Sequence, residues 1–305
     1  MSLYVSVGHD RDESDGYGYI YTSSDGIEWT LTLERGNEDF EGFYDVANDG
    51  NMWVVVGNTG IITSTDGLTW SASINTDTND DAISDLRAVH YAHGAWMAGG
   101  NNGNLYLSTN GLEWAWISDG AEFYDFAADI LTISAHASGW YVAGTEGNGY
   151  TAWYANQILP VTWQGFFLPG VPPDTDNDMD PIRDITSHED SGIGNALYGG
   201  NFNGLFTGLG DGISRFDEVN DFPDTDPGGI FDNAHIYGMA FSPTLGRWVF
   251  AAGPRPYYAD GVDGVSGSVA NFDYGIAPYQ DDVRGVAWSS CDEQFIYVGT
   301  WDPYQ

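Results

Sequence analysis

The sequence predicts an all-β fold, because one pattern of short apolar strands recurs along most of its 305 residues. Each repeat has one apolar strand, a second strand that ends in glycine, and a hairpin that ends in tryptophan. The composition agrees with a folded chain, since 42% of the residues are hydrophobic and 15% are aromatic, which supplies a large core. No run of 18 or more apolar residues occurs, so we expect no membrane-spanning segment.

The first strand of the repeat occurs six times. Its matched apolar residue advances by about 43 to 54 positions from one copy to the next, a spacing typical of four-stranded propeller blades. The six copies are residues 44–47, 87–90, 131–134, 183–186, 237–240 and 284–287.

The second strand is rich in aromatic and β-branched residues and closes with glycine in most copies, which indicates a strand that enters a turn. Residues 3–8 fit the same pattern as the six later copies. Those copies are residues 53–57, 96–99, 140–144, 197–199, 248–251 and 295–299.

The third and fourth strands flank the sharpest motif, in which serine, aspartate or asparagine, glycine and tryptophan keep a constant spacing. The acidic or amide side chain can accept hydrogen bonds from the turn, glycine takes a positive φ, and tryptophan packs between neighbouring blades. We therefore assign these residues a structural role. They are Ser23, Asp25, Gly26 and Trp29, then Ser64, Asp66, Gly67 and Trp70, and then Ser108, Asn110, Gly111 and Trp114.

These motifs resemble the Asp-box (BNR-repeat) β-propellers, a group that includes sialidases and photosystem assembly-factor-like propellers. The resemblance covers almost the whole chain as architecture. The motif is clear in the first three repeats, where it is one residue shorter between Asp and Trp than the usual pattern. The resemblance implies that the motif residues lie at the blade periphery and are not catalytic.

We therefore predict a single β-propeller domain over residues 1–305, built from four-stranded antiparallel blades. The repeats favour six blades, with a ring closed by strands from both termini, which would leave no exposed sheet edge. Residues 3–8 and 295–299 compete for one position in the last blade. Seven blades, a terminal strand packed elsewhere, and a strand accepted by a neighbouring subunit are the alternatives.

The charge balance excludes several classes of partner. Eight Lys+Arg residues, all of them arginine, stand against 45 Asp+Glu, and the formal net charge is −37. Such a surface repels phosphate backbones and anionic headgroups, so we expect no nucleic-acid binding and no membrane insertion. An ion-rich medium would screen this charge. We expect an extracellular or virion-associated protein although no signal peptide is visible, with the cytoplasm as the alternative.

Arg87, Arg183 and Arg284 occupy one position at the start of three first strands. Around one mouth of a propeller channel, three equivalent arginines could bind an anion, and their geometry suits a carboxylate. The alternative is that each pairs with nearby Asp or Glu of this acidic chain.

An acidic loop supplies the candidate metal site. Its alternating carboxylates have the oxygen-rich composition that Ca²⁺ prefers, although the loop lacks the glycine and glutamate of an EF-hand. A solvated acidic loop is the alternative, and no cofactor other than calcium is expected. The candidate calcium ligands are Asp174, Asp176, Asp178 and Asp180.

Residues 77–81 and 221–226 have a similar acidic composition. The histidines lack zinc-site spacing. The single cysteine, Cys291, excludes an intramolecular disulfide, and we expect its side chain to be buried.

The leading functional hypothesis is a non-enzymatic module that displays loops to a protein partner, to copies of itself or to a glycan within an extracellular, filament or virion assembly. Two alternatives remain. A sialidase-like glycoside hydrolase would need an arginine cluster beside a tyrosine–glutamate pair. An assembly factor for a larger complex would need a basic or apolar docking patch.

Overall fold

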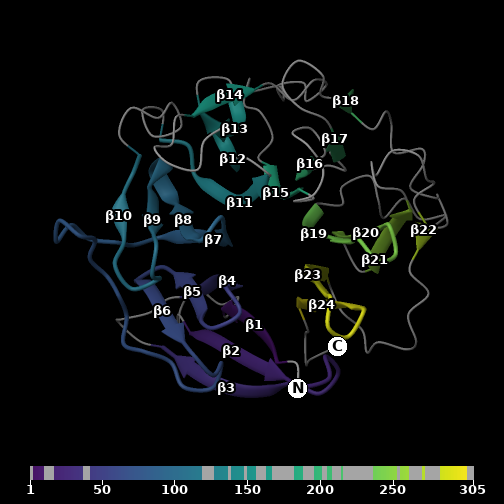
Figure 1. The fold of residues 1–305 in the computed structure, drawn as a ribbon, viewed down its shortest axis with the longest axis horizontal. Coiled ribbons are helices and arrows are strands. Elements are labelled where there is room, and N and C mark those ends of the chain that lie inside the picture. Colours follow the sequence, from purple (N-terminus) through teal and green to yellow (C-terminus); the bar gives the residue numbers. More distant parts are fainter. Residues whose placement is uncertain are drawn as a thin grey trace. The chain divides into compact units, whose positions relative to one another are not determined.

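The computed structural model describes residues 3–9, 17–36, 42–118, 127–136, 139–147, 150–155, 163–166, 182–187, 196–200, 205–207, 214–215, 236–252, 255–260, 270–271 and 282–300. In these ranges the chain forms strands β1 to β24 and a short 3₁₀ helix, η1, at Asn101–Gly103. No helix within them is long and apolar enough to cross a membrane. Figure 1 labels the elements along the chain.

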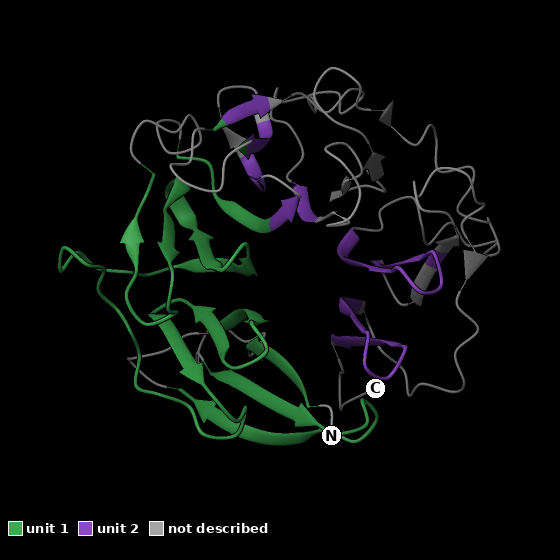
Figure 2. Ribbon diagram, in the orientation of Figure 1, with its two compact units in different colours: residues 1–133, 155–163 green, residues 134–154, 164–305 purple. Residues whose placement is uncertain are grey.

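The contacts divide the chain into two compact units. The first unit comprises Met1–Ile133 and Ala155–Trp163, and the second comprises Ser134–Tyr154 and Gln164–Gln305 (Figure 2). A single domain over residues 1–305 stays a prediction.

The described residues of the first unit form three complete sheets. The first has the order β1-β2-β3, the second β4-β5-β6, and the third β10-β9-β8-β7. Their strands are β1 (Tyr4–His9), β2 (Gly18–Ser23), β3 (Thr30–Arg35), β4 (Phe43–Asn48), β5 (Trp53–Gly57), β6 (Gly60–Ser64), β7 (Leu86–Ala92), β8 (Ala95–Gly100), β9 (Leu105–Ser108) and β10 (Ala115–Trp116).

The next sheet has the order β11-β12-β13-β14 and includes residues of both units. Its strands are β11 (Ile130–His136), β12 (Gly139–Gly147), β13 (Tyr150–Ala155) and β14 (Gln164–Phe166).

The remaining sheets belong to the second unit. They have the orders β15-β16-β17-β18, β19-β20-β21-β22 and β23-β24. Their strands are β15 (Ile182–Ser187), β16 (Ala196–Gly200), β17 (Leu205–Thr207), β18 (Ser214–Arg215), β19 (Ile236–Ser242), β20 (Arg247–Ala252), β21 (Arg255–Asp260), β22 (Ala270–Asn271), β23 (Asp282–Ser289) and β24 (Gln294–Thr300).

The sheets confirm the predicted all-β class with antiparallel strands. Neighbouring strands pair antiparallel in sequence order, for example β7 with β8 and β8 with β9. Within the described ranges, four sheets contain four strands, the first two sheets have three each, and the last has two. The number of blades and the closure of a ring by both termini stay predictions.

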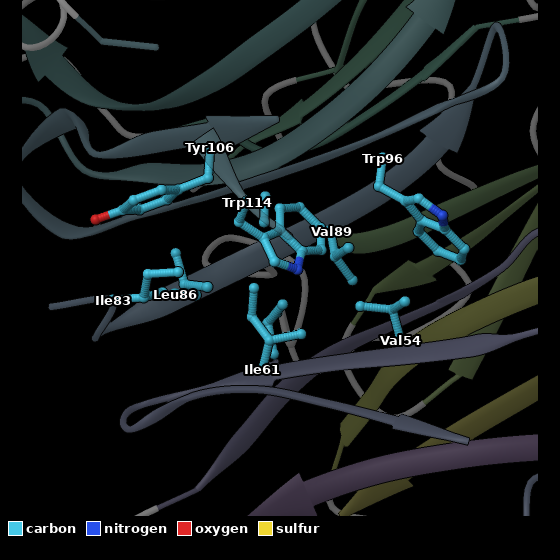
Figure 3. Close-up of a cluster of buried hydrophobic side chains, with 10 residues drawn as sticks. Val54, Ile61, Ile83, Leu86, Val89, Trp96, Tyr106 and Trp114 are labelled. Atoms are coloured by element: carbon cyan, nitrogen blue, oxygen red, sulfur yellow. The ribbon is translucent and has the colours of Figure 1, made fainter. Parts of the chain in front are cut away.

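Tryptophans of the turn motif join neighbouring sheets of the first unit. Trp114 is fully buried in a cluster with Val54 and Ile61 of the second sheet and with Leu86 and Val89 of the third. Figure 3 shows the Trp114 indole among these side chains. Because burial of one such aromatic side chain is worth roughly 1.5–3 kcal/mol, these contacts are a main source of cohesion between the sheets.

Trp70 has an equivalent position one sheet earlier. It packs against a cluster that contains Ile20 of β2, Phe43 of β4, and Val55 and Ile62 of the second sheet. The recurring tryptophan therefore reaches a neighbouring sheet in at least two consecutive repeats.

Cys291 is exposed, which corrects the expectation of a buried thiol. The residue lies in the short turn between β23 and β24, where the side chain has no sheet to cover it.

Candidate binding site

Five of the strands that begin a repeat share a shift of pairing register at one position near their start. The pairing of β4, β7, β15, β19 and β23 with the following strand skips one residue at this position. Such a bulge leaves the extra residue outside the ladder and redirects its side chain. The skipped residues are all arginine or tyrosine: Tyr44, Arg87, Arg183, Tyr237 and Arg284.

In the first unit, these residues form a group that we call the first cluster: His9, Tyr44, Arg87 and Asn101. The Arg87 Cζ atom lies 4.0 Å from the centroid of the Tyr44 ring, a cation–π contact. The Arg87 Nε–H group donates a hydrogen bond to Asn101 Oδ1 at 3.1 Å. The His9 ring lies 5.1 Å from the Tyr44 ring, at an angle of 58°.

In the second unit, Arg183, Tyr237 and Arg284 form the second cluster. Arg284 Cζ lies 3.8 Å from the centroid of the Tyr237 ring, and Arg183 Cζ lies 5.6 Å from the same centroid. The three residues come from β15, β19 and β23, and β19 contacts both of the other strands. Two guanidinium groups therefore converge on one tyrosine.

Two aspartates link consecutive sheets by hydrogen bonds. Each of them directly follows a skipped residue. Asp45 Oδ2 accepts a hydrogen bond of 2.8 Å from the Val89 amide, which links β4 to β7. Asp184 Oδ2 accepts one of 2.6 Å from the Met239 amide, which links β15 to β19. Because these bonds set the spacing of the first strands, they also position the arginine and tyrosine side chains beside them.

The cluster geometry suits recognition of an anion. A guanidinium that makes a cation–π contact carries its N–H donors in a planar fork. Donors in this arrangement match the two oxygens of a carboxylate. Arg183 and Arg284 lie near the same tyrosine ring. Anion binding by Arg87, Arg183 and Arg284 stays a prediction.

Sequence reasoning named the arginines but missed the tyrosines. Tyr44 and Tyr237 occupy the same register position as the arginines, so the alternation of the two residue types was visible in the aligned repeats. What was missing was the contact between adjacent sheets, which the sequence register does not show.

The turn motif is a closed hydrogen-bonded unit in all three copies. The serine Oγ accepts a hydrogen bond of 2.8 Å from the amide of the motif glycine. The Oδ1 atom of Asp25, Asp66 or Asn110 accepts hydrogen bonds of 2.7–2.9 Å from the two amides after the glycine. Within the turn, these acceptors are engaged by the backbone.

The hydrogen bonds of this turn also stabilise its carboxylates. Amide donors from Thr69 and Leu68 lower the pKa of Asp66 to about 2, and those of Glu28 and Ile27 lower the pKa of Asp25. Glycine is required at this position because the φ angle is 75° at Gly26 and 71° at Gly67 and Gly111. The side chain that follows it, Ile27, Leu68 or Leu112, is exposed.

The candidate calcium ligands Asp174, Asp176, Asp178 and Asp180 lie outside the described residues, so the calcium site stays a prediction. In the described ranges, no group of three or more His, Cys, Asp or Glu side chains is arranged to hold a metal ion. The related loop at residues 77–81 closes on itself, since Asp77 Oδ1 accepts hydrogen bonds from the amides of Asn79 and Asp81.

Comparison with known proteins identifies the fold. No family model and no curated protein matches the sequence. Among solved structures, the chain is similar to the WD40 beta propeller domain of Doa1, with 13% identity and a TM-score of 0.60 over 98% of this chain and 86% of that one. The chain has a β-propeller fold.

Two further structures resemble this propeller. YCF48 from Cyanidioschyzon merolae has 12% identity and a TM-score of 0.58, over 93% of this chain and 88% of that one. The extracellular domain of BT4673 from B. thetaiotaomicron has 12% identity and a TM-score of 0.66 over 97% of this chain. This chain spans only 37% of the length of that domain. At these identities the likeness concerns the fold alone.

Proposed function

We propose that this propeller is a non-enzymatic binding module that holds a carboxylate group of a protein partner at its arginine–tyrosine clusters. The observation that carries the proposal is the second cluster, where Arg183 and Arg284 both lie against the ring of Tyr237. Two of the eight basic residues of the chain gather on one aromatic ring. Guanidinium groups bind a carboxylate through charge-assisted hydrogen bonds that are frequently bidentate.

The net charge of −37 sharpens the selectivity of this site. A uniformly acidic partner would be repelled by the surrounding surface, because like charges oppose association. A partner that presents one exposed carboxylate on a neutral or basic surface would be accepted. The proposed ligand is therefore an aspartate, glutamate or C-terminal carboxylate on a neutral or basic surface of the partner.

The setting of the module is part of the same proposal. The proposed setting is an extracellular assembly, because an ion-rich medium would screen the net charge of −37. The Asp-box resemblance and the regular turns support a rigid scaffold role. A carboxylate-bearing glycan is the alternative ligand, and the described residues offer no observation that favours glycoside hydrolysis.

The test compares charge variants of the full chain on two arrays. One array holds peptides with single acidic residues and their amide counterparts, and the other holds glycans with and without carboxylates. We expect binding to acidic peptides that falls about tenfold or more in the Arg183→Gln and Arg284→Gln variants, since a charge-assisted hydrogen bond contributes about 1.5–3 kcal/mol.

Arg247→Gln is the matched control. Arg247 also makes a cation–π contact, 4.2 Å from the ring centroid of Tyr258, but on β20 and β21 rather than at the cluster. This variant should bind as the wild type does. Equal loss in all three variants, or no discrimination between acidic and amide peptides, would refute the proposal, and binding to acidic glycans alone would replace its ligand.

A further inference from the structure

A pocket of about 270 Å³ lies in the second unit, between the β19–β20 turn and the β23–β24 turn. Its lining is mostly apolar and aromatic, and Glu293 supplies a carboxylate at its edge. The lining includes Leu245, Val249, Trp288, Glu293, Phe295 and Tyr297.

The two turns beside the pocket are built alike. Ser242 Oγ accepts a hydrogen bond of 3.0 Å from the Leu245 amide, and Ser289 Oγ accepts one of 3.3 Å from the Asp292 amide. Gly246 and Glu293, each directly before the next strand, both take a left-handed backbone, with φ of 60° and 52°. The walls are therefore ordered before a ligand arrives, which lowers the entropy cost of binding.

The aromatic wall of this pocket is more accessible than its counterparts in other sheets. Trp288 of β23 lies opposite Phe295 of β24, with ring centroids 4.7 Å apart. The same kind of cross-strand pair recurs as Tyr91 with Trp96 and as Phe241 with Trp248.

In those two pairs the residue on the second strand is buried, with 1% exposure for Trp96 and 0% for Trp248. Phe295 and Tyr297 of β24 are instead only partly buried, and Leu245 on the facing turn is 54% exposed. An apolar side chain that entered here would remove several apolar surfaces from water at once.

The negative charge at the edge of the pocket determines which apolar ligands the pocket favours. Glu293 is exposed at the edge of the pocket, and Asp292 precedes it in the same turn. Together with the net charge of −37, these carboxylates favour a ligand that carries a positive charge beside its apolar group.

From this geometry we propose that the pocket is a docking site for an extended segment of a partner protein that presents a large apolar side chain next to a basic residue. The site rests on the binding role proposed above but is separate from the clusters. Arg284 precedes Ser289 by five residues in β23, a rise of about 16 Å along the strand. The apolar side chain packs against Trp288, Phe295 and Leu245, and the basic group lies near Glu293.

Cys291 provides a direct test, because it is exposed, is the single cysteine of the chain, and lies two residues from Glu293. The full chain is equilibrated with short cysteine-containing peptides in a buffer of reduced and oxidised 2-mercaptoethanol. Intact-mass measurement then gives the fraction of protein joined to each peptide. The probes are acetyl-Trp-Arg-Gly-Cys-amide, acetyl-Trp-Glu-Gly-Cys-amide and acetyl-Ala-Arg-Gly-Cys-amide.

We expect the Trp-Arg peptide to be captured at least about fivefold more than either of the others. Leu245→Asn should remove most of this preference, and Glu293→Gln should reduce the discrimination between the Trp-Arg and Trp-Glu peptides. Leu68→Asn is the matched control, because Leu68 is 55% exposed on a turn of the other unit, and it should change nothing.

Equal capture of the three peptides, or a preference that survives Leu245→Asn, would overturn the proposal. Arg284→Gln separates this site from the proposed function. Capture that is unchanged in that variant supports an independent pocket even where no acidic ligand is found on the arrays. Capture that falls with Arg284→Gln would show that the two sites are one, and would refute the separate pocket.

Discussion

Asp66 accepts hydrogen bonds from three donors in its own turn, namely the Ser64 hydroxyl and the amides of Leu68 and Thr69. Asn110 accepts the equivalent bonds in the third copy of the turn without a charge. At the residue scale, the shared requirement is therefore a correctly placed oxygen acceptor. The charge adds a dependence on pH.

Substitution of Asp66 tests this dependence. Its pKa is about 2 in the folded chain and 3.8 ordinarily, so the stabilisation is present above about pH 4 and is lost as the pH falls toward 2. Asp66→Asn should lower the urea midpoint at pH 7 modestly, because the neutral amide oxygen keeps the hydrogen bonds but loses the stabilisation of the charge, and should make the decline between pH 4 and 2 shallower. Urea unfolding at several pH values measures both effects.

Asn110→Asp is the reciprocal variant, and its decline over the same pH range should be steeper than that of the wild type. If both variants followed the wild-type pH dependence, the carboxylate of the turn would not be coupled to folding.

At the scale of elements, Asp45 and Asp184 each accept a hydrogen bond from the first strand of the next repeat. These bonds explain how consecutive sheets are held together. Hydrogen bonds of a ladder join strands within one sheet, whereas these two bonds join different sheets. The skipped residue before each aspartate turns an arginine or tyrosine toward the same junction. Structural linkage and the candidate site therefore share one local irregularity.

Asp45→Ala should lower the free energy of unfolding by about 1.5–3 kcal/mol, because it removes a hydrogen bond to a charged group. The Val89 amide should then exchange its hydrogen at least about tenfold faster, since Asp45 is its acceptor. Hydrogen exchange followed by NMR or mass spectrometry measures this rate.

Asp45→Asn keeps an oxygen acceptor and should lose less stability than Asp45→Ala. The Val142 amide, in β12, serves as the internal reference. Protection of Val89 that remained at the wild-type level in Asp45→Ala would show that the bond does not hold β4 to β7.

At the scale of the whole molecule, the excess of negative charge opposes folding. Forty-five acidic residues face eight basic ones, so most carboxylates repel one another in the folded state. The screening length falls from about 10 Å at 0.1 M salt to about 3 Å at 1 M, which weakens this repulsion.

Raising sodium chloride from 0.1 to 1 M at pH 7 should therefore increase Tm by about 2–5 °C, as a stabilisation of about 1 kcal/mol or more would do. Differential scanning calorimetry measures the change. The control is the same series near the pI of 4.1, where the net charge is close to zero and the rise should vanish. An equal rise at both pH values would point to general salt effects rather than to charge screening.

Local chemistry alone determined the strands and the turns of this protein. The alternation of apolar residues, the terminal glycines of the second strands and the constant spacing of Ser64, Asp66 and Gly67 are properties of neighbouring residues, and the antiparallel sheets follow from them. The burial of Trp96 in a strand and the exposure of Leu68 in a turn follow from the same local pattern.

Only the tertiary structure decided which side chains of different sheets meet. The contact of Arg284 with Tyr237, the bond from Asp45 to Val89 and the partly exposed Phe295 each depend on the distance between two sheets. That distance is set by the packing of side chains from different repeats, which the spacing of residues within one repeat does not show. For this reason the sequence predicted a group of three arginines that could bind an anion but not their aromatic partners, whereas the structure places these arginines against tyrosines of neighbouring sheets.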